Sequence, residues 1–297
     1  MESPSLQLPV PDLFDYRQLV ERLMRAASEI VHQVENDRIY KCIPWNDEDV
    51  LLELSDGGDC LRIWLPTQTN PPNEELLAHI ADYVKEWLDL DTNLTPFYAL
   101  AARDPLLAEA ANRFRGLWLI GIPDLYEALS WGILGQQINL SFAYTLKRRL
   151  VQRYGSAVHY QARTYWRFPD ASRIAAVAPS ELQELQISGR KAEYLIDIAS
   201  RIAAGTLSKE GLRAAGDAAA DELVALRGIG PWTAQYVLMH CLRRRNAFPV
   251  ADVGLHQAIR QAAGLQRKPT PAEVSELGRG WSGWEAYAVY YLWRLLY

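Results

Sequence analysis

The sequence predicts an antiparallel α+β domain followed by an all-helical region. Three segments near the start, residues 34–43, 50–54 and 61–65, alternate apolar and polar side chains as half-buried strands do. After residue 95 this alternation gives way to helical periodicity, broken at intervals by Gly, Pro and Ser. A chain of 297 residues can bury more than one core. We therefore place the α+β domain at residues 1–95 and the helical region at residues 96–297.

The turns and flanking helices of the first domain follow from its residue types. Asn46 and Asp47, and the Asp-Gly-Gly-Asp run at residues 56–59, separate the alternating segments, and such residues favour hairpin turns. Helical periodicity predicts one helix at residues 16–30 and another at 74–88, one on each side of the meander. The expected domain is an antiparallel sheet packed with helices.

In the second region, capping residues and helical periodicity predict a compact bundle with short connections. Polar residues that favour the N-cap stand at expected helix starts, including Asp124, Ser188 and Asp252. The expected helices span residues 124–136, 141–154, 188–204, 217–226, 231–242 and 284–297, and a further helix begins at residue 252.

Composition excludes several classes of protein. No apolar run approaches the roughly 20 residues that span a bilayer, and the start lacks a secretory signal, so we expect a cytoplasmic protein. Cys42, Cys60 and Cys241 form no CxxC pair, which argues against a disulfide framework, a zinc site or an iron–sulfur cluster. The net charge of -5 does not indicate a nucleic-acid protein. Local basic clusters such as residues 147–149 are by default solvated helix faces.

The most informative segment is residues 226–234, with the sequence LRGIGPWTA. Gly228 and Gly230 bracket one apolar residue, and Pro231 suits the first position of a helix. Glycines permit positive φ and close approach of another backbone, so that N–H groups here can point outward together. Such a nest at a helix N-terminus binds a phosphate without side-chain charge, which would reconcile DNA binding with an acidic chain. Taken alone, the segment favours a structural αα-hairpin over a DNA-binding motif, because this pattern occurs in many proteins.

A second element follows at Asp252, which ends an apolar stretch and begins the next predicted helix. The simplest role for such a residue is an N-cap, which stabilises a helix by about 1 kcal/mol. The helix dipole also orients a carboxylate at this position and keeps it ionised. An N-cap role and a catalytic role are therefore compatible.

Together these motifs resemble the helix-hairpin-helix DNA glycosylases, and most closely the bacterial 3-methyladenine DNA glycosylase II branch. Residues 133–137 (ILGQQ) resemble the helical ILGQ segment of that branch. Residues 168–193 resemble its FP…(K)RAE stretch, and residues 281–293 resemble its W-x-x-W-x-x-Y-A…W ending. The resemblance implies a helix-hairpin-helix near residues 217–242 within an all-helical glycosylase region.

The resemblance also implies a reaction. The enzyme would flip a damaged base out of duplex DNA and hydrolyse its N-glycosidic bond in base excision repair, with Asp252 as the catalytic carboxylate. Bifunctional members carry a lysine nucleophile where this chain has Trp232, so we expect a monofunctional enzyme. The base pocket would consist of Trp232, Tyr236 and Trp293, of which the first two share a helix face. Such a pocket attracts a cationic alkylated purine, of the 3-methyladenine or 7-methylguanine type.

The remaining expected contacts come from the same resemblance. The DNA-binding residues would be Gly228, Gly230, Thr233, Gln136, Gln137 and Ile138. The apolar wedge of the family aligns with Gln137, so either Gln137 pairs with the orphaned base or Ile138 intercalates. No cofactor is required, but a monovalent cation, Na+ or K+, would bind the backbone carbonyls of Val224, Leu226 and Ile229. We expect a monomer whose partner is damaged double-stranded DNA.

Three other interpretations stay open. A glycosylase for oxidised guanine or mismatched adenine would need a lysine at position 232 or cluster cysteines. A non-catalytic DNA-binding module would need neither Asp252 nor an aromatic pocket. A methyl-transfer protein using Cys241 would need a neighbouring group that lowers the pKa of its thiol.

Overall fold

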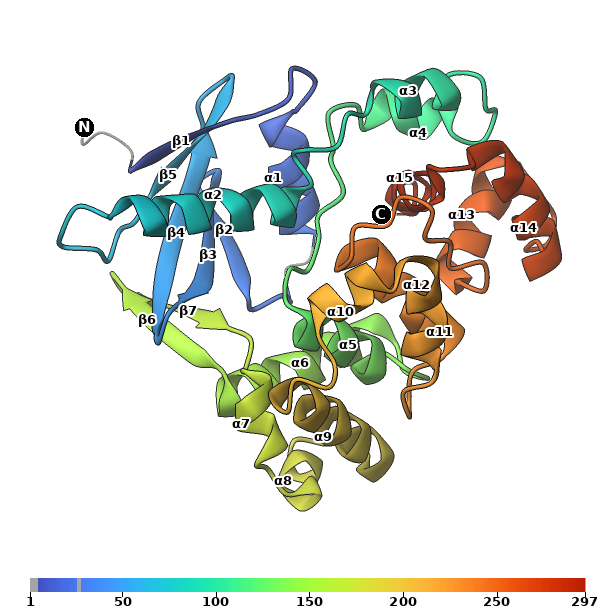
Figure 1. Cartoon of the computed structure of the whole chain (residues 1–297). Helices are drawn as coiled ribbons and strands as arrows, with labels where there is room; N and C mark the ends of the chain where they lie inside the picture. Colours follow the sequence, from blue (N-terminus) through green and yellow to red (C-terminus); the bar gives the residue numbers. More distant parts are fainter. Residues whose placement is uncertain (1–4, 26–27, 297) are drawn as a thin grey trace.

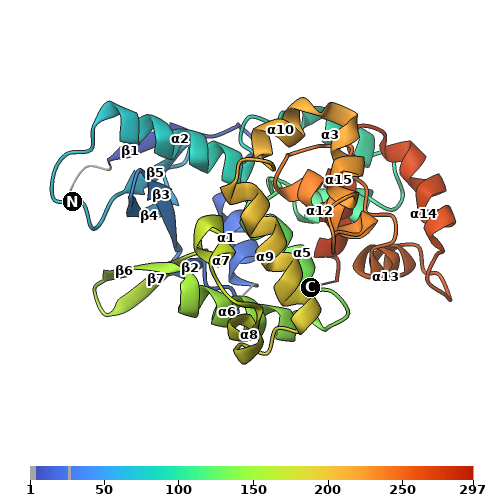
Figure 2. The same cartoon turned by 60° about the horizontal axis from the view of Figure 1, so that its bottom comes forward.

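The computed structural model describes residues 5–25 and 28–296, with a sheet at one end and helices at the other (Figure 1). The strands of the sheet, in blue, lie on the left of Figure 1, and the C-terminal helices α13 and α14, in red, lie at the far right. Figure 2 shows the same separation from a second direction, with α1 on the side of the sheet that is nearest to the helical region. The fold class predicted from the sequence is confirmed.

The first part is a five-stranded antiparallel sheet with two helices on one face. Its elements are β1 (Leu6–Pro9), α1 (Tyr16–Met24), β2 (His32–Glu35), β3 (Arg38–Trp45), β4 (Glu48–Asp56), β5 (Cys60–Trp64) and α2 (Glu74–Leu88), with the strand order β1-β5-β4-β3-β2. Side chains alternate across a strand, so Val50, Leu52 and Leu54 pack with the two helices while Leu51 faces the other side.

Three details of this part differ from the sequence prediction. Residues 34–43 are not one strand, because Asn36 and Asp37 both adopt positive φ and form the two-residue turn between β2 and β3. The helix predicted at residues 16–30 ends at Met24, and residues 26–27 of that prediction lie outside the described residues. β1 has no counterpart in the prediction, because four residues are too few to show an alternating pattern.

The second part consists of short helices. They are α3 (Thr95–Ala101), α4 (Ala108–Arg113), α5 (Leu125–Leu134), α6 (Leu140–Tyr154), α7 (Ala171–Ala175), α8 (Pro179–Glu184), α9 (Gly189–Ala203), α10 (Lys209–Ala214), α11 (Ala219–Val224), α12 (Pro231–His240), α13 (Val253–Ala262), α14 (Pro271–Gly278) and α15 (Glu285–Arg294), with 3-10 turns at Gly216–Ala218 and Arg279–Trp281. The predicted end of the last helix, Tyr297, lies outside the described residues. No helix in the described part of the chain is long and apolar enough to cross a membrane.

A two-stranded hairpin, β6 (Ser156–Tyr160) and β7 (Arg163–Arg167), interrupts the helical region and was not expected there. Tyr165 packs against Tyr40 of β3 with ring centroids 5.0 Å apart, on the face of the sheet opposite α1 and α2. Arg167 also pairs with Asp49 of β4. The hairpin therefore covers part of the second face of the five-stranded sheet, and this packing stabilises its two strands.

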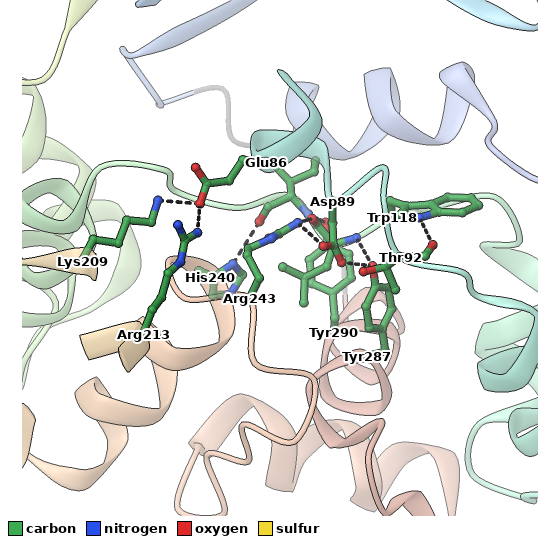
Figure 3. A network of polar contacts seen from close by, with 12 residues as sticks. Glu86, Asp89, Thr92, Trp118, Lys209, Arg213, His240, Arg243, Tyr287 and Tyr290 are labelled. Carbon is green, nitrogen blue, oxygen red and sulfur yellow. Dashed lines mark hydrogen bonds and ion pairs between the residues drawn. The ribbon is translucent and has the colours of Figure 1, made fainter. Parts of the chain in front are cut away.

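A second junction joins the two parts at the C-terminal end of α2 (Figure 3). Asp89 pairs with Arg243, whose Nη2 lies 3.3 Å from its Oδ1, and accepts a hydrogen bond from the Tyr287 hydroxyl. Glu86 pairs with Lys209, with Nζ 2.6 Å from Oε1, and with Arg213. These contacts fix the sheet domain against α10, α15 and the segment that follows α12.

Candidate active site

Asp252 is the N-cap of α13, and its carboxylate accepts three hydrogen bonds. Oδ1 accepts from the backbone N–H of Leu255 at 2.6 Å and from the indole N–H of Trp293 at 2.8 Å. Oδ2 accepts from the indole N–H of Trp232 at 2.8 Å. Three N–H donors suit an ionised carboxylate, which only accepts. The half-buried side chain is therefore held in one orientation while a ligand can still reach it.

The predicted pocket residues lie together around this carboxylate. Along α12, the ring centroids of Trp232 and Tyr236 are 5.4 Å apart, and those of Tyr236 and His240 are 4.3 Å apart. Trp293 of α15 lies parallel to His240 at 6.2 Å, with an interplanar angle of 3°. The four rings form one continuous aromatic stack, which we call the α12 stack. Two of its indoles also orient Asp252.

His240 is absent from the sequence prediction, although its spacing of four residues from Tyr236 indicates the same helix face. Its Nδ1 donates a hydrogen bond to the Ile120 carbonyl at 3.0 Å (Figure 3). Burial lowers the pKa of His240 to about 3, so the imidazole is neutral. It therefore contributes an uncharged aromatic wall to the α12 stack.

Two further aromatic residues near the stack could not be predicted from sequence spacing. Trp131 of α5 and Tyr144 of α6 have ring centroids 4.7 Å apart. Burial and the nearby Tyr144 phenol both raise the pKa of Tyr236 above its usual range. Tyr144 therefore lies close to the α12 stack, although α6 and α12 are far apart in sequence.

The two glycines of the hairpin between α11 and α12 differ in backbone conformation and in the space around them. Gly228 has a φ of 91°, and a Cβ there would lie 2.3 Å from the Tyr194 ring, so only glycine fits. Gly230 has a φ of -92°, and a Cβ there would meet nothing within 4 Å. The positive φ considered for the hairpin glycines is thus found at Gly228 and not at Gly230. As the N-cap of α12, Gly230 has no side chain to bond the first-turn N–H groups.

The ILGQ and RKAE segments meet at this hairpin. The Gln136 side chain donates a hydrogen bond to the Gly228 carbonyl at 2.8 Å. Lys191 donates to the carbonyls of Leu134 and Gln136, each at 2.8 Å. Both side chains hold the end of α5 against the hairpin, so the structure assigns them contacts within the protein.

The other predicted DNA-binding residues differ in exposure. Gln137 is exposed and has a φ of 57°, which projects it from the loop before α6. Ile138 is half-buried and packs against the helical core. Thr233 is only 2% exposed and lies against Gly132 of α5, so its side chain is a packing group and its backbone N–H is what the helix start offers.

The comparison with known protein families decides the classification. A family model described as "HhH-GPD superfamily base excision DNA repair protein" matches residues 131–282, which include the hairpin and Asp252. The chain belongs to this superfamily. A second model, the N-terminal domain of 8-oxoguanine DNA glycosylase, matches residues 16–129. The predicted class of enzyme, a helix-hairpin-helix DNA glycosylase, is confirmed.

Similar proteins extend over the whole chain. A DNA-3-methyladenine glycosylase of Bacillus subtilis is 42% identical over 292 residues, which are 98% of this chain and 96% of the relative. The structure of a 3-methyladenine DNA-glycosylase from Archaeoglobus fulgidus matches with a TM-score of 0.80 and 22% identity, covering 97% of each chain. An 8-oxoguanine glycosylase/lyase of Clostridium acetobutylicum, solved with double-stranded DNA, matches with a TM-score of 0.75 and 18% identity, covering 99% of this chain and 98% of that one.

A buried ion-pair cluster joins the HhH-GPD region to the sheet domain. Lys147 of α6 donates to Glu29 and to Glu127 of α5, each at 2.8 Å, and all three side chains are at most 10% exposed. Burial alone would raise the pKa of Glu29, but the Lys147 ammonium, His32 and the Ile30 N–H together lower it to about 2. Lys147 is therefore not on a solvated helix face, as residues 147–149 were expected to be.

The structure also bears on the methyl-transfer alternative. Cys241 is fully buried, and this burial raises the pKa of its thiol to about 12, so no reactive thiolate forms. Within residues 5–25 and 28–296, no group of three or more His, Cys, Asp or Glu side chains is placed to hold a metal ion. The buried, protonated Cys241 thiol therefore gives no support to the methyl-transfer alternative.

Proposed function

We propose that this chain is a monofunctional DNA glycosylase that releases alkylated purines, of the 3-methyladenine and 7-methylguanine types, from duplex DNA. The observation that carries the proposal is the Asp252 carboxylate, fixed by two indoles of the α12 stack. The 42% identical relative named as a DNA-3-methyladenine glycosylase supports the class of base. A DNA-binding module without chemistry would need Asp252 only as the N-cap of α13, and the two indole N–H bonds to its carboxylate go beyond that role.

Cleavage of the N-glycosidic bond builds positive charge on the sugar, and Asp252 would stabilise that charge. The bond between sugar C1′ and the base nitrogen breaks, and its electron pair leaves with the base. Water, oriented by the same carboxylate, attacks C1′ and releases its proton to the solvent. An alkylated purine is cationic before cleavage and neutral afterwards, so it leaves without a second carboxyl group as an acid.

The α12 stack supports selection of such a base. A cation over an aromatic face gains about 0.5–2 kcal/mol per ring. Trp232, Tyr236 and Trp293 present electron-rich faces, and neutral His240 adds no opposing charge. A positively charged purine would therefore bind here more tightly than an undamaged one.

The monofunctional assignment rests on the lysines around the site. Trp232 occupies the position at which bifunctional relatives would carry an amine nucleophile. The ammonium of Lys191 is bound to two backbone carbonyls, and that of Lys147 is buried between two carboxylates. Water is therefore the nucleophile we propose.

Methylated duplex DNA should lose free 3-methyladenine and 7-methylguanine and keep an intact abasic strand. With borohydride present, no protein–DNA adduct should form, because trapping requires a Schiff base with an amine nucleophile. Chromatography of the released bases and a denaturing gel of the strand measure both outcomes. A trapped adduct would contradict the monofunctional assignment, and absence of any released base would contradict the proposed function.

We place the grip on the DNA backbone at the start of α12, where the first-turn N–H groups and the helix dipole favour a phosphate. A monovalent cation would fit beside it on the carbonyls of Val224, Leu226 and Ile229. Val224 ends α11, so its carbonyl lies at the negative end of that helix. Exposed Gln137, rather than half-buried Ile138, is the candidate to fill the gap left by the flipped base.

Gly230→Ala should weaken binding to damaged and undamaged duplexes alike. The added methyl group would enter the open space at the helix start, where a phosphate approaches, and phosphate contacts carry no sequence information. The slope of log affinity against log salt should change little, because backbone amides displace no counterions. Salt titrations of binding for the parent and the variant measure both quantities.

The matched control is Gly189→Ala, at the start of α9, where a Cβ meets only ordinary contacts of 3.6 Å or more. It should bind like the parent. Gly228→Ala is unsuitable as a test, because its Cβ would collide with Tyr194 and disturb the hairpin itself. If Gly230→Ala binds undamaged duplex as tightly as the parent, the hairpin is only a structural turn.

A further inference from the structure

Arg22 reaches the α12 stack from the sheet domain. It lies on α1, the helix on the side of the sheet nearest to the helical region (Figure 1 and Figure 2). Its guanidinium carbon is 5.7 Å from the centroid of the Tyr290 ring, and Tyr290 meets His240 edge-on with centroids 6.3 Å apart. Its charge also acts on Tyr236 and on His240. Arg22 therefore lies close to the α12 stack, next to the ring of Tyr290.

The surroundings of Arg22 are phenols rather than carboxylates. Burial lowers the pKa of Arg22, but the neighbouring Tyr290, Tyr144 and Tyr236 raise it more, so the guanidinium stays charged. None of the ion pairs found in the described part of the chain includes it. A guanidinium carries five N–H donors, and the contact with Tyr290 cannot use them all. A ligand with acceptor atoms would complete this set.

The cation itself is unexpected beside the α12 stack. Four aromatic rings attract a positively charged base, whereas a guanidinium at the same pocket repels it. A site that selected only by positive charge would be better without Arg22. Its presence indicates that the pocket also reads hydrogen-bond acceptors on the base.

We infer that Arg22 is a specificity-determining residue, whose guanidinium donates hydrogen bonds to an oxygen at position 6 of the flipped-out purine. The inference rests on the proposed function and names which purines the pocket favours. Arginine binds the O6 and N7 atoms of guanine as a fork, which is the commonest specific contact of proteins with DNA bases. Hypoxanthine presents the same two acceptors without a charge, and 7-methylguanine keeps O6. 3-Methyladenine instead presents an amino donor at position 6 and a positive charge.

The test uses Arg22→Met, which keeps an unbranched side chain, and Arg22→Lys, which keeps the charge but loses the fork. Single-turnover release is measured for hypoxanthine from a synthetic duplex, and for 7-methylguanine and 3-methyladenine from one methylated DNA. In Arg22→Met, hypoxanthine release should fall about 10-fold to 100-fold, the effect of one bidentate contact. The ratio of released 7-methylguanine to 3-methyladenine should fall as well, and 3-methyladenine release should not decrease. Arg22→Lys should lie between the parent and Arg22→Met.

The amounts of the three released bases also distinguish a change in base specificity from a general loss of activity. Arg17→Met, on the same helix but with a side chain 77% exposed, is the control and should leave the ratio unchanged. Because both methylated bases come from one reaction, a partly unfolded variant would lower both and leave their ratio intact. Equal loss of all three bases in Arg22→Met would overturn the inference. A parent that releases 3-methyladenine but neither 6-oxopurine would also overturn it and leave the proposed function standing. A parent that releases no base would refute the proposed function itself.

Discussion

Asp252→Asn should reduce base release from methylated duplex DNA by about 10²–10³-fold, the scale for losing one electrostatic partner of a transition state. Asparagine caps a helix as well as aspartate does, so α13 should keep its bond from the Leu255 N–H. The neutral amide cannot stabilise a cationic sugar. With the bond from the Leu255 N–H kept, its NH2 group stands in the place of Oδ2 and faces the indole N–H of Trp232, which places one donor against another.

The measurement is single-turnover release together with DNA affinity and a thermal melt. DNA affinity should persist, because we place the contact with the DNA backbone at the hairpin rather than at Asp252. Asp15→Asn is the matched control, since Asp15 caps α1 through the N–H groups of Arg17 and Gln18 and loses the same charge. It should release base like the parent. Release by Asp252→Asn within about tenfold of the parent would remove the role assigned to this carboxylate.

The features that could be predicted from the sequence are those whose chemistry is local. The glycine pattern, a proline at the first helical position and an aspartate at an N-cap are each defined by a few consecutive residues. The pairing of Trp232 with Tyr236 follows from helix spacing alone, and the structure bears it out. The same spacing points to His240.

The features that could not be predicted depend on contacts between distant segments. Arg22 and Tyr144 approach the α12 stack from α1 and α6, and no local pattern marks them. The β6–β7 hairpin lies within a helical region, and its strands are stabilised by the packing of Tyr165 against Tyr40, a sheet residue more than a hundred positions earlier in the sequence. β-strand preference of this kind reflects packing on a partner surface rather than the backbone alone.

Neighbouring residues of one motif also differ in role for tertiary reasons. Gly228 is required by the Tyr194 ring, while Gly230 has open space around it. Thr233 stands two residues after the proline of the hairpin, yet its side chain is buried against Gly132. Sequence motifs single out the segment that we propose to face DNA, and only packing separates its structural residues from those that can meet a phosphate.

Lys147→Met should lower the free energy of unfolding by about 3–5 kcal/mol at neutral pH, the cost of removing one partner from a buried ion pair. Lys147 lies between Glu29 and Glu127 with a side chain 3% exposed, so its loss leaves two buried carboxylates without the ammonium that bonds them, and only the more distant Lys41 remains to offset their charge. Urea denaturation of the parent and the variant measures the difference. Arg148→Met, one residue further on an exposed face, should cost far less and is the control.

The pH dependence of the free energy of unfolding shows whether lost charge pairing causes the destabilisation of Lys147→Met. In the parent, the pKa of Glu29 is about 2 in the folded protein, below its value in the unfolded chain. Its pairing therefore stabilises the fold above the unfolded pKa and is lost as the pH falls toward 2. In Lys147→Met, Glu29 and Glu127 lack the cation and take up protons more readily than in the unfolded chain. The stability difference between parent and variant should therefore narrow as the pH falls from about 7 to about 5.

Removing the two carboxylates as well completes this test. Glu29→Gln and Glu127→Gln, combined with Lys147→Met, leave neither carboxylate buried without the ammonium that bonds it, while Lys41 stays nearby. The triple variant should therefore be more stable than Lys147→Met alone and should not gain stability on acidification from these groups. If the triple variant is no more stable than Lys147→Met, or if the stability difference between parent and Lys147→Met stays constant with pH, the destabilisation comes from packing around methionine. The cluster spans α5, α6 and the segment before β2, and the Lys147 ammonium lies 5.6 Å from the centroid of the Trp131 ring, so its integrity also affects where Trp131 and Tyr144 stand.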